Sequence, residues 1–303
     1  MKRTLFLASS LLVLLLMAAC QKGDSAVTIS VKIPDSPQTK AIAQAEKVDI
    51  VYYEVWNADW SKQYFPSDNS ALASAPVSGG RATIDLVLVK GQTYNLIFWA
   101  CNEASDAYDV NSLQKVEVDY SVMAENGNSD YYDAFYSVNT ITVTSSFNET
   151  IVLRRPFAQL NFGASKMATS FGDIVLEKSE VTVSELATVF DTRNGVGVVP
   201  AGAPVTFKAN SIATTEMLQT NGQSYAWITM DYMLMMDEQD AVEVDASFVL
   251  KDNNSPIVHK VHNVPLRKNY RTNIVGDLFT SNASLKVIVD PAFVDDYEIN
   301  ITK

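Results

Sequence analysis

Runs of alternating apolar and polar residues recur along this chain, and the first of them sets the pattern. In residues 27–33, Val27, Ile29, Val31 and Ile33 fall on one side and polar residues fall between them. A period of two predicts a β-strand with one buried face. Two prolines follow within four residues and end the strand, because proline cannot donate a ladder hydrogen bond.

Similar runs predict strands through the rest of the chain. In the first half they cover 47–56, 82–89, 93–101, 138–144 and 149–154, with 113–120 as either strand or short helix. Short connectors predict two hairpins, one joining 82–89 to 93–101 and one joining 138–144 to 149–154. Residues 57–80 are polar and rich in turn residues, and they predict a loop. In the second half the predicted strands are 157–162, 173–183, 203–209, 225–235, 242–250, 257–263, 268–275, 284–289 and 297–302.

No segment carries a helical stripe over three turns, and residues 185–190 predict one short helix. Many short strands separated by turn signals are typical of β-sandwiches and barrels. Arg155 and Pro156 interrupt the pattern, so we place a domain boundary there. The prediction is an all-β protein with two tandem domains, residues 27–155 and 156–303.

The first twenty residues have a different character. Lys2 and Arg3 precede an apolar run, and small residues stand directly before Cys20. A basic start, a short apolar run and a small-residue cleavage site predict a secretory signal peptide over residues 1–19. The cysteine at the cut resembles a bacterial lipobox, whose cysteine receives acyl chains such as palmitate. We therefore expect lipidation of Cys20 and a tether over residues 20–26; the alternative is an ordinary signal peptide with a chance cysteine.

Charge and cysteine content exclude several partners. The chain carries a net charge of −12, and without residues 1–19 it keeps 21 basic against 35 acidic residues, a net charge of −14. Such a surface repels phosphate backbones and anionic headgroups, so nucleic-acid binding is not expected and the lipid must provide the anchoring. With Cys20 acylated, Cys101 has no intramolecular partner, and its apolar surroundings in the sequence predict a buried, inert thiol.

The sequence offers little for catalysis. His259 and His262 stand three residues apart on a predicted strand, where they would point to opposite faces and could not hold one metal ion. Nucleophile elbows, zinc-protease motifs and phosphate-binding loops are absent from the sequence. We therefore expect no enzyme activity, no metal and no cofactor, although a pair of carboxylates brought together in space would leave no sequence signature.

Aromatic residues are the more informative set. Trp56, Trp60 and Tyr64 lie close together in the sequence, partly in a predicted loop. Exposed on one face, they could stack against sugars or a protein partner, whereas buried they would close one end of a sandwich. The methionine-rich run 230–236 predicts a core strand rather than a binding groove.

Three longer motifs resemble the fimbrillin-like lipoproteins of Gram-negative gut and oral anaerobes. They are Leu153-Arg-Arg-Pro-Phe-Ala-Gln-Leu-Asn-Phe-Gly163, Val264-Pro-Leu-Arg-Lys-Asn-Tyr-Arg-Thr-Asn-Ile-Val-Gly276 and the tail that begins at Leu285, and together with the lipobox they span the mature chain. The resemblance implies two tandem transthyretin-like Greek-key β-sandwiches and a lipid-anchored protein of the outer membrane at the cell surface. It implies a fimbrial subunit or adhesin whose partners are other fimbrillin-like subunits, joined by β-strand addition, or surface ligands of host or bacterial cells, with no catalytic residues.

One departure from that family concerns proteolysis. Stalk subunits of the family lose their lipidated first strand to an arginine-specific protease, yet no arginine lies between Cys20 and Arg81. A cut at Arg81 would remove two predicted strands, and a cut at Arg154 or Arg155 would remove a domain. The first strand and its lipid are therefore expected to stay, as in an anchor subunit.

Two further expectations remain open at this point. Asp24-Ser25-Ala26 matches the pattern that these bacteria O-glycosylate, which makes Ser25 a candidate modification site. The alternative function is a glycan-binding surface lipoprotein that captures polysaccharide. The feature that discriminates this alternative is whether Trp56, Trp60 and Tyr64 form one flat exposed platform.

Overall fold

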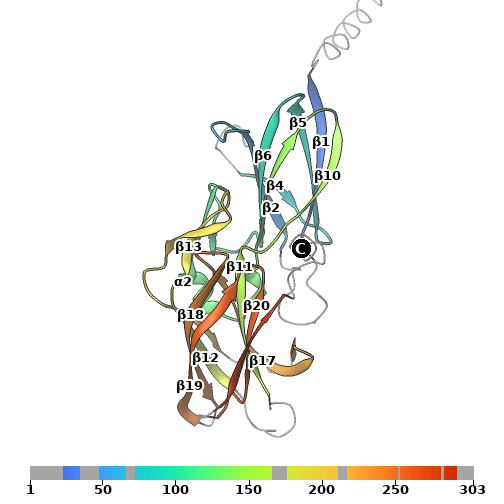
Figure 1. Ribbon diagram of the computed structural model, residues 1–303. Helices are drawn as coiled ribbons and strands as arrows, with labels where there is room; N and C mark the ends of the chain where they lie inside the picture. Colours follow the sequence, from blue (N-terminus) through green and yellow to red (C-terminus); the bar gives the residue numbers. More distant parts are fainter. Residues whose placement is uncertain are drawn as a thin grey trace, which may run out of the picture.

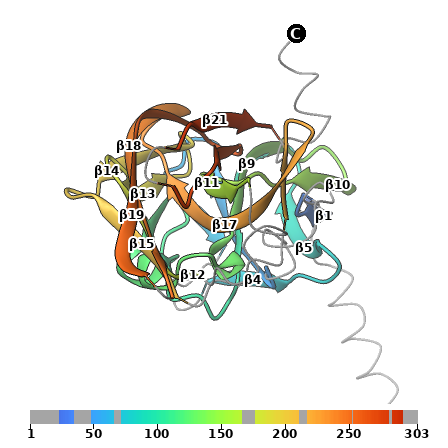
Figure 2. The ribbon, with the colours of Figure 1, turned by 90° about the horizontal axis from the view of Figure 1, so that it is seen from below.

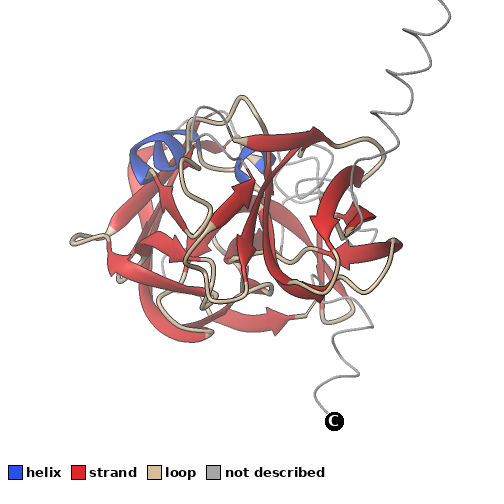
Figure 3. Cartoon of the chain, turned by 90° about the horizontal axis from the view of Figure 1, so that it is seen from above, coloured by secondary structure: helices blue, strands red, loops and turns tan. Residues whose placement is uncertain are grey.

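β-Strands make up almost all of the regular structure in the computed structural model, which describes residues 23–34, 48–65, 72–165, 176–210, 217–251, 253–280 and 283–291. Helical residues in these ranges are confined to α2 (Tyr120–Met123) and two 3₁₀ turns, η2 (Ala124–Asn126) and η3 (Asp130–Tyr132). Figure 3 shows this balance, with short blue helices beside a body of red strands. The predicted all-β class is confirmed.

Two sheets enclose the first core. Sheet A runs in the order β10 (Phe147–Val152), β1 (Asp24–Lys32) and β5 (Arg81–Val89). Sheet B contains β3 (Gln63–Phe65), β4 (Ala73–Pro76), β2 (Ile50–Asn57), β6 (Thr93–Cys101) and β9 (Phe135–Thr142), with β3 and β4 both on the outer edge of β2. β5 alternates strictly between exposed and buried residues. Its apolar side chains therefore meet those of sheet B across the core.

A second pair of sheets encloses the second core at the other end of the molecule (Figure 1). Figure 2 shows the molecule from below, at this end. Sheet D runs in the order β16 (Met217–Thr220), β17 (Gln223–Leu234), β11 (Phe157–Ala164), β20 (Arg271–Gly276) and β21 (Leu285–Asp290). Sheet E runs in the order β15 (Val205–Asn210), β12 (Leu176–Val183), β18 (Gln239–Leu250) and β19 (Asn253–Arg267). Phe162 of sheet D and Phe248 of sheet E meet edge to face, with ring centroids 5.7 Å apart.

Sheet C joins the two halves of the chain. Its order is β14 (Val196–Pro200), β13 (Ala187–Asp191), β8 (Lys115–Val118) and β7 (Tyr108–Asp109). β8 from the first half pairs with β13 from the second, with Val116 opposite Phe190. A continuous ladder of hydrogen bonds therefore crosses from one half to the other.

β6 is buried on both faces and separates the two cores. Leu96 and Phe98 belong to the first core, whereas Ile97 and Trp99 belong to the second. Strands buried on both sides read as continuous apolar runs, which is the pattern of 93–101. The predicted boundary at Arg155 and Pro156 lies between β10 and β11. However, residues 107–136 of the first half also contribute to the second core, and the boundary stays a prediction.

Most predicted strands are present, but their pairing differs from the prediction. β5 and β6, predicted as a hairpin, lie in opposite sheets, and so do β9 and β10. Both hairpin predictions are wrong because these connectors are arches that cross from one sheet to the other. An arch and a hairpin have the same alternating sequence pattern, and only the core decides between them.

Some elements differ in type or extent. The short helix predicted at 185–190 is wrong, because these residues enter β13, and the predicted loop 57–80 contains β3 and β4. β1 begins at Asp24, three residues earlier than predicted. The strand predicted at 297–302 lies outside the described residues. Within the part of the chain that the structure describes, no helix is long and apolar enough to span a membrane.

Candidate functional site: the first strand and its groove

β1 occupies the centre of sheet A and is hydrogen-bonded on both sides. It pairs antiparallel with β5, placing Ile29 opposite Ile84, and parallel with β10, placing Val31 opposite Ile151. The hydrogen bond from Ile33 N to Gly80 O extends this attachment beyond the end of the strand. Since β5 and β10 do not pair with each other, β1 alone connects them within the sheet.

The inner face of β1 fills four positions of the first core. Val27, Ile29, Val31 and Ile33 are each at most 1% exposed. Burying an aliphatic side chain of this size contributes about 1.5–3 kcal/mol relative to leaving it in water. The outer face is polar, and Thr28 donates a 2.7 Å hydrogen bond to Asp85 on β5. The alternation seen in the sequence is therefore the division between core and solvent.

Loss of β1 would leave a groove one strand wide. Neighbouring strands lie about 4.8 Å apart, so β5 and β10 are separated by roughly 9.6 Å, the width that a single strand fills. The groove would expose apolar sockets and two unpaired strand edges. Both features favour addition of a strand from another chain. The geometry of sheet A thus suits strand exchange and requires no catalytic group.

The arginines after β1 lie in ordered backbone. Arg81 begins β5 and exchanges backbone hydrogen bonds with Ser78, while Arg154 exchanges backbone hydrogen bonds with Tyr136. A protease must bind its substrate as an extended, accessible segment, and paired backbone resists this. Neither position therefore presents an open cleavage segment.

Arg155, at the junction between the two halves, is fully buried in an ion pair with Asp133. Its Nε lies 2.8 Å from Asp133 Oδ1 and its Nη2 lies 2.7 Å from Oδ2. The guanidinium also lies 4.4 Å from the ring centroid of Phe135. Burial alone would lower the pKa of Arg155, but the charge and hydrogen bonds of Asp133 outweigh it and raise the pKa. This pair leaves no signal in the sequence, because its two members are 22 residues apart on different segments.

The three predicted stacking aromatics do not form one platform. Trp56 and Trp60 pack against the second core, whereas Tyr64 packs against the first. The two tryptophan rings are tilted by 41° at a centroid distance of 6.4 Å. Arg193 lies over the Trp60 ring at 4.6 Å, which covers part of its face.

The predicted lipidation site, the predicted glycosylation site and the second cysteine lie in different surroundings. Cys20 lies outside the described residues, and its lipidation stays a prediction. Ser25 belongs to β1 rather than to a tether and is buried, so its glycosylation, still a prediction, would require the start of β1 to open. Cys101 is buried, as predicted, and burial raises the pKa of its thiol to about 12.

The two histidines point in different directions, as the spacing predicts. His259 is buried, with Nε2 2.7 Å from the carbonyl oxygen of Leu278. His262 is exposed and its Nδ1 contacts Glu243. Across the described ranges, no group of three or more histidine, cysteine or acidic side chains is arranged to hold a metal ion.

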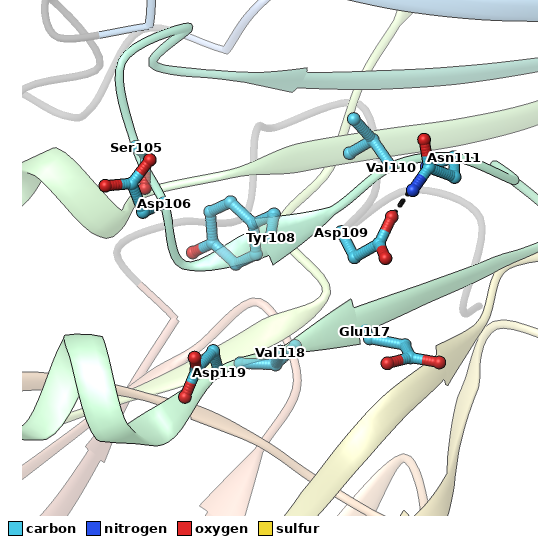
Figure 4. Close-up of a pocket in the computed structure, with 9 residues that line it drawn as sticks. All are labelled: Ser105, Asp106, Tyr108, Asp109, Val110, Asn111, Glu117, Val118 and Asp119. Carbon is cyan, nitrogen blue, oxygen red and sulfur yellow. Dashed lines mark hydrogen bonds between the residues drawn. The ribbon is translucent and has the colours of Figure 1, made fainter.

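An open cleft of about 590 Å³ lies beside β7 and β8 (Figure 4). Four acids line it: Asp106, Asp109, Glu117 and Asp119. Asp109 and Glu117 are opposite each other across the two strands, and both are exposed. A general acid in glycoside hydrolysis needs a raised pKa, which usually comes from burial. All four acids of this cleft are exposed to solvent rather than buried.

Comparisons with known proteins agree with the architecture. Residues 20–302 match the model of a family of unknown function, DUF6562. The chain belongs to the DUF6562 family. No curated protein matches this DUF6562 sequence.

Solved structures share the fold of this DUF6562 protein at low identity. A candidate polysaccharide-binding protein (DUF1812) from Bacteroides thetaiotaomicron has a TM-score of 0.52 at 14% identity, covering 90% of this chain and 99% of its own. A candidate cell-adhesion protein from Bacteroides uniformis has a TM-score of 0.52 at 10% identity, with coverages of 90% and 99%. The tip fimbrial protein Mfa3 from Porphyromonas gingivalis, truncated at its C-terminus, has a TM-score of 0.50 at 10% identity, with coverages of 88% and 99%. The predicted fimbrillin-like resemblance is confirmed at the level of the fold.

Proposed function

We propose that this protein is a cell-surface subunit or adhesin of the fimbrillin type, held at the outer membrane by a lipid on Cys20 and assembled by β-strand addition. The observation that carries the proposal is the position of β1, a terminal strand at the centre of sheet A with four buried apolar side chains. The other subunits of the assembly would be fimbrillin-like chains. The fold shared with fimbrial and adhesin proteins supports the same assignment.

An anchor-like position follows from retention of β1. While β1 fills its own groove, the groove cannot accept a strand from a neighbour, so the chain would end an assembly built through it. The arginines that follow β1 support retention, because Arg155 is buried and Arg81 and Arg154 lie in hydrogen-bonded backbone. We propose no catalytic role; Asp109 and Glu117, which face each other across β7 and β8, are both exposed to solvent.

Isolation of the protein from the membranes of its native host tests this function. Intact mass should give a chain that begins at Cys20 and carries acyl groups, and fimbrillin-like chains should co-purify with it. A mature chain that begins after residue 41 and lacks lipid would contradict the anchor-like role. Absence of any co-purifying fimbrillin-like chain would contradict the role of subunit and leave only that of adhesin.

The glycan-binding alternative keeps two of its three predicted residues. Trp56 and Trp60 are adjacent and partly exposed, with Arg193 against Trp60. Tryptophan and arginine side chains together can contact a sugar ring. A glycan array should then give a signal that Trp60→Ala removes and Tyr64→Ala does not; an array without signal rejects this alternative.

A further inference from the structure

The end of the first sandwich beside the start of β1 has an unusual surface. Lys90 N donates a hydrogen bond to Gly23 O, and Gly91 N donates to Val143 O. The β5–β6 and β9–β10 turns therefore meet the beginning of β1 at one end of the molecule. In Figure 1 this end is at the top, opposite the end that carries β19. We name Gly23, Val87, Val89, Lys90 and Gln92 the proximal end.

Exposed apolar side chains and two turns without acidic residues distinguish the proximal end. Val87 is 60% exposed and Val89 is 46% exposed on the outer face of β5. Residues 86–93 and 141–148 contain one lysine and no acid, although the chain has 35 acidic residues. Asp24, half-buried opposite Val89, and Asp85, further along the same face, are the nearest acids on β1 and β5. A protein surface that rests on a membrane combines apolar side chains, which enter the headgroup region, with few acidic side chains that the headgroups would repel.

We propose that the proximal end rests on the lipid bilayer, with Val89, Val87 and Lys90 at the headgroup region and the second core away from the membrane. This inference rests on lipidation of Cys20. Only three peptide units separate Cys20 from Gly23, and an extended chain spans at most about 3.6 Å per residue. The lipid-bearing Cys20 can therefore lie no further than about 11 Å from Gly23, which holds this end of the molecule near the membrane.

Lipid quenching of single fluorescent labels tests this orientation. The chain is produced with its own leader and Cys101→Ala, so that acylation uses Cys20 and an introduced cysteine is the remaining thiol. Val89→Cys probes the proximal end. Val152→Cys is the matched control, because Val89 and Val152 are both valines, both 46% exposed and both in sheet A. Val89 pairs with Asp24 of β1, and Val152 pairs with Lys32 of β1. Asp24 and Lys32 are eight residues apart, which is about 27 Å along the strand. Val258→Cys on β19 probes the opposite end.

Each labelled protein is reconstituted into phosphatidylethanolamine–phosphatidylcholine vesicles with and without spin-labelled lipid. We expect quenching at Val89→Cys to exceed that at Val152→Cys and Val258→Cys by at least threefold, and Gln92→Cys to behave like Val89→Cys. Equal quenching at positions 89 and 152 would overturn the inference, as would no quenching at either position 89 or 92. Intact mass separates the two proposals: an acylated chain without proximal quenching contradicts this inference alone, whereas a chain without acyl groups contradicts both.

Discussion

Asp231 is the residue whose surroundings most clearly predict a pH effect. It is buried beneath the loop that follows η2, where Asn128 N lies 3.4 Å from its Oδ1. Burial raises the pKa of Asp231 to about 7, and the hydrogen bond from Asn128 offsets only part of this effect. The same loop is fixed to β17, because the Asn128 amide donates to Ile228 O and accepts from Met230 N.

The stability of the protein should therefore fall as the pH rises from about 4 to about 7. In this range the folded state keeps a proton on Asp231 that the unfolded state has already lost, so raising the pH favours unfolding. A shift of about 3 pH units corresponds to about 4 kcal/mol as an upper limit. Denaturant unfolding of the wild type and of Asp231→Asn should show a smaller decline for the variant. Parallel curves for the two proteins would contradict this role of Asp231.

Replacement of Arg155 should be among the most costly single changes at the junction. Arg155→Met leaves the carboxylate of Asp133 buried without its partner, and breaking such a pair typically costs about 3–5 kcal/mol. Arg154→Met is the matched control, since Arg154 is exposed and should change stability by less than about 1 kcal/mol. The free energies of unfolding from urea titration decide between them; equal values would show that the buried pair contributes little.

Among the secondary-structure elements, β1 is the strand on which the proposed function depends. Ile29→Ala removes a fully buried side chain from the centre of the strand and should lower the free energy of unfolding by about 2–5 kcal/mol. Ser30→Ala, one residue further on the polar face, should change it by less than about 1 kcal/mol. Urea unfolding measures both variants. Similar losses would mean that the alternation of β1 does not divide core from solvent.

The alternation of apolar and polar residues predicts which segments form strands, but it does not predict which strands pair. Val27, Ile29, Val31 and Ile33 identify β1 because burial selects one face of a strand. The same signal predicts β5 and β6 correctly and then pairs them wrongly, since a short connector serves both a hairpin and an arch. β13 was missed because its burial depends on β8, a partner some 70 residues away. The groove of β1 between β5 and β10 is likewise a property of the assembled sheets.

At the scale of the whole molecule, the two cores share a strand. Cys101 ends β6, faces the second core and is 3% exposed. Burial raises the pKa of its thiol to about 12, so the reactive thiolate is scarce at neutral pH. Cys101 should react with a thiol reagent only when sheet B separates from the second core, at a rate at least a thousandfold below that of a free thiol. Reaction at the rate of an exposed cysteine in the folded protein would contradict the shared core.

Strand replacement tests the central claim most directly. A protease site inserted between β1 and β2 allows the folded chain to be cut there, and a labelled peptide of residues 24–33 is then added in excess. The account predicts that the cut chain takes up this peptide, that the uncut chain does not, and that a peptide with Ile29→Asp fails with both. Equal uptake by cut and uncut chains, or no uptake by the cut chain while it remains folded, would contradict the claim that β1 is a replaceable strand that closes its own groove.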